Sequence, residues 1–159
     1  MLLAGAAGGA LFAGAASGFP RHTRRVLVHG LIVTATLYVY VAARGHAGWA
    51  WLGAELAGVA LYGGMALRGL RASPWWIAVA WALHPVWDVA LHLVGAGRAF
   101  VPAAFPTGCL AWGPVVAAAV AAGVLLRARR ITAPAPAAPA RYAVPPAVAP
   151  SQPFHSIGD

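Results

Sequence analysis

The stretch WALHPVWDVALHL, residues 81–93, decides the fold, because it is apolar enough for a membrane helix yet carries three titratable side chains. His84, Asp88 and His92 are spaced i, i+4 and i+8. At 3.6 residues per turn each step advances only about 40°, so the three share one narrow helical face. An ionisable group in the membrane interior costs about 2.5 to 3.5 kcal/mol on insertion scales, and such groups turn away from lipid. We therefore expect this face to point into a helix bundle.

The composition of the whole chain also predicts a membrane protein. Of its 159 residues 9% are charged and 61% are hydrophobic, whereas soluble domains have about 25% charged residues. The apolar runs are about 18 to 23 residues long, which is enough to cross a hydrocarbon core of roughly 30 Å. The chain is therefore expected to be an all-α, polytopic transmembrane bundle of about five spans, at residues 2–19, 26–43, 48–67, 74–96 and 109–126.

The arginines predict how this bundle is oriented. All eleven basic residues are Arg, and they sit in short clusters between the apolar runs, which is typical of the positive-inside rule and argues against a nucleic-acid partner. With five spans, one side holds only Arg44 and Arg98. This predicts an outer N-terminus, a cytoplasmic C-terminus and, since the composition indicates a GC-rich bacterial genome, a multi-pass protein of the bacterial cytoplasmic (inner) membrane. The arginines of the other side are Arg21, Arg24, Arg25, Arg68, Arg71, Arg127, Arg129, Arg130 and Arg141.

Both ends of the chain need an interpretation. The segment 2–19 could be a cleaved signal peptide, but it lacks a basic leader region, so a retained helix is favoured. Its pairs Gly5 with Gly9 and Gly14 with Gly18 favour close packing within the bundle. Residues 131–159 are rich in Pro and Ala and without apolar periodicity, which predicts a disordered cytoplasmic tail after a transmembrane domain of residues 1–130.

Aromatic side chains cluster at the predicted span ends. We interpret them as interface anchors: Trp75 and Trp76 at the inner face, and Tyr38, Tyr40, Trp49 and Trp51 at the outer face.

Glu55, on the third span, is expected at the same depth as Asp88. Each lies seven or eight residues from the outer end of its span, roughly 10 to 12 Å below the surface. Two carboxylates that meet at low dielectric cannot both ionise cheaply, so they would share a proton, bind a cation or recruit a histidine. His92 is one turn from Asp88 and is the expected partner. The candidate site residues are thus Glu55, Asp88 and His92, with His84 below them.

A divalent metal is one use for this cluster. Glu55, Asp88 and His92 are candidate ligands, whereas His84 and His92 are about 12 Å apart along the helix and cannot bind the same ion. A metal-free buried polar network is the alternative. The single cysteine, Cys109, excludes an intramolecular disulfide and a Cys-rich metal site, and is expected to be a small packing residue. No phosphate-binding glycine loop or nucleophile elbow that would indicate a nucleotide cofactor or a hydrolase is present.

The segment from Glu55 to Cys109 resembles a family of small, uncharacterised bacterial integral membrane proteins. The resemblance implies a membrane bundle with this polar stripe and no known reaction. Two positions depart from the family pattern, since Leu91 stands where relatives tend to have a second histidine and Gly113 where they tend to carry an acid. The matching elements are Glu55, LY at 61–62, RGLR at 68–71, WALHPVWD at 81–88, His92, FVP at 100–102 and GC at 108–109.

Three functional classes stay open. The first is an accessory or structural membrane subunit, which needs a tight polar cluster and an apolar groove for a partner. The second is a metal-assisted membrane enzyme acting on a lipid-like substrate, with the loop before Cys109 as a lid. The third is a small proton-coupled transporter, which needs a polar path to both faces. The expected partners are the lipid bilayer and either another membrane protein or further copies of this chain.

Overall fold

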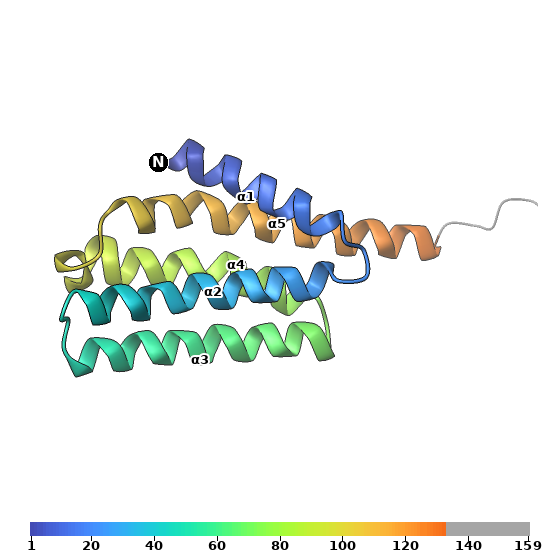
Figure 1. Cartoon of the computed structure of the whole chain (residues 1–159). Coiled ribbons are helices and arrows are strands. Elements are labelled where there is room, and N and C mark those ends of the chain that lie inside the picture. The colour runs from blue at the N-terminus through green and yellow to red at the C-terminus, as the bar shows by residue number, and fades with distance from the viewer. Residues whose placement is uncertain (133–159) are drawn as a thin grey trace, which may run out of the picture.

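The computed structural model describes residues 1–132, and this part of the chain is helical throughout, without strands. This confirms the predicted all-α fold, and the five α-helices are about as many as the expected spans. Figure 1 shows them as a bundle. They are α1 (Leu2–Ser17), α2 (Thr23–Arg44), α3 (Trp49–Arg71), α4 (Trp75–Asp88) and α5 (Ala104–Thr132), with a π-helix η1 (Val89–Val94) and a 3₁₀ segment η2 (Ala96–Ala99) between α4 and α5.

Four helical segments are long and apolar enough to cross a membrane: α2, α3, the continuous stretch of α4 and η1, and α5. Helix α1 is apolar but has 16 residues, about 24 Å of helix, so it is shorter than the hydrocarbon core. Large apolar side chains such as Leu3, Val33 and Val86 are exposed, while Glu55 and Asp88 are buried. This distribution is the reverse of a soluble protein and is expected for a protein surrounded by lipid.

Consecutive helices run antiparallel (Figure 1), so the loops alternate between the two ends of the bundle. Helix α5 packs against α1 and α4, and α3 packs against α2 and α4. One end holds Arg44 and Arg98. The opposite end, which we call the Arg-rich end, holds all the other arginines of the described residues: Arg21, Arg24, Arg25, Arg68, Arg71, Arg127, Arg129 and Arg130. Arg141 and the predicted tail beyond residue 132 lie outside the described residues.

Glycines set the contact between α1 and α5. Gly5 lies directly against the backbone of Gly108, and a Cβ added at Gly9 would be 2.9 Å from the carbonyl oxygen of Trp112. The predicted close packing within the bundle is confirmed for this pair. At Gly14, by contrast, a Cβ would have no heavy atom within 4 Å, so this glycine is not part of the helix contact.

Buried polar contacts hold α4 in the centre. The indole Nε1 of Trp81 donates a hydrogen bond to the carbonyl oxygen of Leu27 at 3.2 Å. The hydroxyl of Tyr62 donates one to the carbonyl oxygen of Leu83, also at 3.2 Å. Pro85 deprives the Trp81 carbonyl of its helical donor. A Cβ at Gly113 would be 2.6 Å from this oxygen, so the backbone of α5 covers it. The proline therefore shapes the α4–α5 contact and adds no acceptor to the polar stripe.

Candidate functional site

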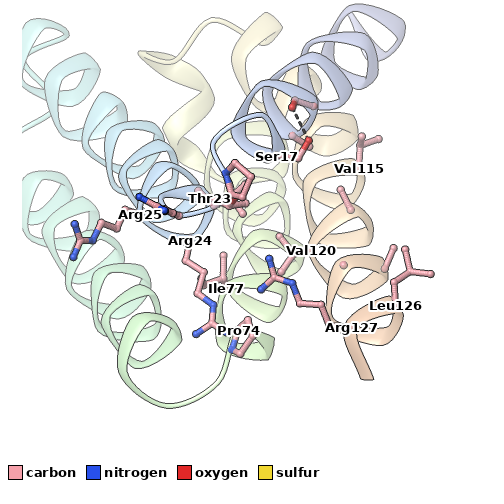
Figure 2. A pocket seen from close by; sticks show the side chains of 18 of the residues that line it. Ser17, Thr23, Arg24, Arg25, Pro74, Ile77, Val115, Val120, Leu126 and Arg127 are labelled. Atoms are coloured by element: carbon pink, nitrogen blue, oxygen red, sulfur yellow. Dashed lines mark hydrogen bonds between the residues drawn. The ribbon is translucent and has the colours of Figure 1, made fainter. Parts of the chain in front are cut away.

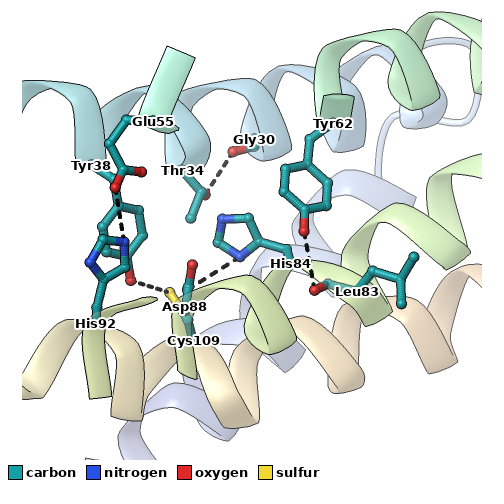
Figure 3. Close-up of polar contacts among 10 residues, drawn as sticks. All are labelled: Gly30, Thr34, Tyr38, Glu55, Tyr62, Leu83, His84, Asp88, His92 and Cys109. Atoms are coloured by element: carbon teal, nitrogen blue, oxygen red, sulfur yellow. Dashed lines mark hydrogen bonds and ion pairs between the residues drawn. The ribbon is translucent and has the colours of Figure 1, made fainter. Parts of the chain in front are cut away.

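The four residues singled out from the sequence are all buried in one region of the bundle (Figure 3). Glu55 and His84 are 2% exposed, and Asp88 and His92 are fully buried. Glu55 comes from α3, His84 and Asp88 from α4, and His92 from η1. The cost of exposing such groups to lipid explains why all of them face inward.

These residues form two pairs. Nδ1 of His84 is 3.5 Å from Oδ2 of Asp88, and Nε2 of His92 is 3.2 Å from Oε1 of Glu55. Both distances are short enough for ion pairs, but the groups are not aligned for hydrogen bonds, and these four atoms have no hydrogen-bond partner. The expected pairing of His92 with Asp88 is therefore wrong: the histidine beside Asp88 is His84.

The π-helix η1 explains this exchange of partners. It begins at Val89, directly after Asp88, and includes His92. Because π-helical hydrogen bonds join residues five apart, each residue advances less around the helix axis than in an α-helix, so the direction of His92 relative to Asp88 differs from the one that α-helical spacing predicts. His92 points towards Glu55, with its Nε2 3.2 Å from Oε1. The apolar spacing of this stretch fits an α-helix and contained no signal for the wider turn.

Tyr38 and Cys109 belong to the same site, although the sequence suggested other roles for them. Tyr38, expected at the membrane interface, is 2% exposed. Its ring stacks on that of His92, with centroids 4.5 Å apart and planes 9° apart. Its hydroxyl lies 3.9 Å from Sγ of Cys109, to which it donates. The Gly-Cys element of the family pattern was the available signal for Cys109, whereas nothing in the sequence marked Tyr38.

Cys109 completes a set of three metal-type ligands. One ligand atom from each of His84, Asp88 and Cys109 lies within 4.8 Å of the other two. An imidazole nitrogen, a carboxylate oxygen and a thiolate are ligands that zinc accepts in proteins. The metal ligands suggested by the sequence were Asp88, Glu55 and His92. In the structure Glu55 and His92 instead pair with each other, next to the set formed by His84, Asp88 and Cys109.

The loop between η1 and α5 closes the site from its nearer end. Phe100 packs edge-on against Trp51, with centroids 5.2 Å apart, and lies 6.2 Å from the ring of His92. Val101 is buried, and a Cβ at Gly97 would be 2.5 Å from Nδ1 of His92. Helix α5 begins at Ala104 rather than at the predicted residue 109, which shortens this loop and leaves it packed on the site.

Four of the other aromatic residues predicted as interface anchors lie at the ends of the bundle, whereas Trp51 packs against Phe100 beside the site. Trp49 is 89% exposed and Tyr40 is 60% exposed at one end, and Trp75 and Trp76 are partly exposed at the other.

Fold and site together define a polytopic helical membrane protein with a buried polar centre. The chain belongs to the family of unknown function DUF6010, whose model matches residues 1–125 and so includes every residue of this centre. Comparison with curated proteins and with solved structures yields no match.

Proposed function

We propose that this chain is an accessory or structural membrane protein whose buried centre holds a divalent transition metal, with His84, Asp88 and Cys109 as ligands. The observation that carries the proposal is the convergence of these three side chains from α4 and α5. We further propose a bacterial cytoplasmic membrane as its location, with the Arg-rich end in the cytoplasm, on the strength of the arginine distribution.

The unpaired atoms of the site support a metal. Nδ1 of His84 and both carboxylate oxygens of Asp88 are buried without a hydrogen-bond partner. Leaving such a group unsatisfied costs about 1 to 3 kcal/mol, and more when it is charged. A cation bound between these atoms would satisfy them at once.

The charge of the three ligands and the distances between them also suit a divalent metal ion. A divalent ion bound to a thiolate, a carboxylate and a neutral imidazole is electrically neutral as a unit, which suits a low-dielectric interior. Bonds of about 2.0 to 2.3 Å in a tetrahedral site separate the ligand atoms by roughly 3.3 to 3.8 Å. The spacing of up to 4.8 Å would have to shorten by about 1 to 1.5 Å when the metal binds. Tyr38 then supplies an outer hydrogen bond to the thiolate, as such sites commonly require.

The alternatives need access to the centre. A metal-assisted enzyme acting on a lipid-like substrate requires a cavity, and a proton-coupled transporter requires a path to both faces. The cavity between Tyr38, Glu55, Tyr62, His84 and Asp88 is about 10 Å³, room for about one water molecule. This favours a closed, structural centre over either alternative.

Elemental analysis of the purified full-length protein tests the proposal. We expect a stoichiometric transition metal, lost in Cys109→Ser, Asp88→Asn and His84→Gln. Reconstitution with Co²⁺ should produce a thiolate-to-cobalt charge-transfer band that Cys109→Ser removes. Zn²⁺ at a hundredfold excess over its Kd should raise the free energy of unfolding by about 2.7 kcal/mol.

His29→Gln is the matched control, because His29 is exposed on α2 and its Nδ1 lies 2.6 Å from the carbonyl oxygen of Arg25, four residues earlier on the same helix. It should keep the metal. A parent protein that neither contains a metal nor binds Co²⁺ or Zn²⁺ would leave a metal-free polar network and overturn the metal site.

A further inference from the structure

A large groove opens at the Arg-rich end of the bundle, in the half opposite to the buried centre (Figure 2). Its volume is about 830 Å³, and its walls come from α1, α2, α4 and α5 with one residue of α3. The inner wall is apolar or small and includes Ala13, Ile77, Val120 and Leu126. The rim carries four arginines: Arg21, Arg24, Arg25 and Arg127.

Open space between α1 and α5 forms part of this groove. The two helices touch at Gly5 and Gly9, but Cβ atoms added at Gly14 and at Gly123 would meet nothing within 4 Å. Both of these glycines line the groove. The space is therefore built into the helix pair, and its floor is closed by Ile77, which is fully buried.

The rim has no acidic counterpart within residues 1–132. The carboxylates in this range belong to Glu55 and Asp88, both buried in the centre, and the ion pairs formed there involve histidines only. In Figure 2 the side chains of Arg24, from α2, and Arg127, from α5, extend towards the same space between their helices. Four arginines around one groove without an acidic partner among residues 1–132 repel each other, so this arrangement favours a bound negative charge.

We propose that the groove binds one anionic phospholipid, with its phosphate between Arg24 and Arg127 and an acyl chain along the apolar wall. Arg binds phosphate through paired, charge-assisted hydrogen bonds, and basic pockets between membrane helices accept anionic headgroups. The volume is that of a typical ligand site. The walls offer almost no polar group besides Ser17 and Thr23, which suits an acyl chain and not a water-soluble phosphate compound.

The test uses the full-length protein in phosphatidylcholine nanodiscs doped with phosphatidylglycerol, with retained lipid counted by native mass spectrometry. The double variant Arg24→Gln with Arg127→Gln should weaken phosphatidylglycerol retention about tenfold or more, since charge-assisted hydrogen bonds are lost. The control is Arg68→Gln with Arg71→Gln. These arginines lie at the same end but do not line the groove, and Arg68 instead lies over the ring of Trp76 at 5.0 Å.

A second variant fills the groove without changing charge. Gly14→Leu with Gly123→Leu should lose phosphatidylglycerol while the thermal stability in pure phosphatidylcholine is kept, because neither Cβ meets another atom. Gly64→Leu is its control: it has the same free space on α3, away from the groove, and should retain the lipid.

Four results would overturn the proposal. Equal loss in the Arg68 and Arg71 control would reduce the effect to general charge at that end. Unchanged retention in the filled groove would place the lipid elsewhere. Binding of phosphatidylglycerol only after the chain is truncated at Thr132 would mean that the tail occupies the groove. A changed oligomeric state in the groove variants would mean that a second copy of the chain occupies it.

Discussion

At the scale of single residues, the partner of each buried ionisable group decides its energetic role. His92 and Glu55 come from η1 and α3 and are 3.2 Å apart, whereas Asp88 lies beside His84 on its own helix. Removing one member of a buried pair leaves the other uncompensated, which typically costs 3 to 5 kcal/mol, while replacing both with apolar residues can be almost neutral. Glu55 and His92 should therefore be coupled in stability.

A double-mutant cycle measures this coupling. We expect His92→Leu alone to lower the free energy of unfolding by about 3 kcal/mol. The double change with Glu55→Leu should recover part of this loss, with a coupling energy of about 0.5 to 3 kcal/mol. Denaturant titration in detergent micelles provides the values.

The comparison cycle is Asp88→Leu with His92→Leu, the pair that the sequence alone favours. Its coupling should be smaller, because His92 is paired with Glu55 and Asp88 with His84. A larger coupling for Asp88 with His92 than for Glu55 with His92 would contradict the pairing seen in the structure.

At the scale of elements, small residues determine where helices touch. Helix α1 has no charged side chain, so its place depends on packing against α5. At Gly5 that contact is backbone to backbone, and at Gly14 there is free space. Two glycines of one helix should thus respond in opposite ways to the same substitution.

We expect Gly5→Ala to destabilise the protein by about 1 to 3 kcal/mol, because its methyl group would overlap the Gly108 backbone. Gly14→Ala should be neutral or stabilise by up to about 1 kcal/mol through better helix propensity. Thermal unfolding of both variants beside the parent decides this. Equal effects would show that α1 does not pack on α5 as described.

At the scale of the whole molecule, the separation of arginines between the two ends sets the expected orientation. Arg44 and Arg98 are the arginines at the end nearer the buried centre, and the others within residues 1–132 lie at the opposite end. The positive-inside rule assigns the Arg-rich end to the cytoplasm. The site would then lie in the outer half of the membrane and the groove in the inner half.

Cysteine labelling in intact cells tests this orientation. In a Cys109→Ser background, a cysteine replacing the exposed Ala99 should react with an impermeant thiol reagent, and one replacing the exposed Ala72, at the other end, should not. Permeabilised cells, in which both should react, provide the control. The reverse pattern would invert the assignment of the two faces.

The sequence by itself determined the all-α fold, the approximate span limits and the burial of His84, Asp88, His92 and Glu55. These follow from local properties: the length of apolar runs, the residues that interrupt them, and the cost of an ionisable group in lipid. Each can be evaluated along the chain without knowing which helices are neighbours.

Only the tertiary structure decided which of these groups are partners. His92 of the π-helix that begins at Val89 pairs with Glu55, and the packing of α2 and α5 against α4 brings Tyr38 to Cys109 across 71 positions of sequence. The groove likewise depends on how α1, α2, α4 and α5 are placed around it. Such features arise from rotations and crossing angles between whole helices, which many side chains set together and no local pattern encodes.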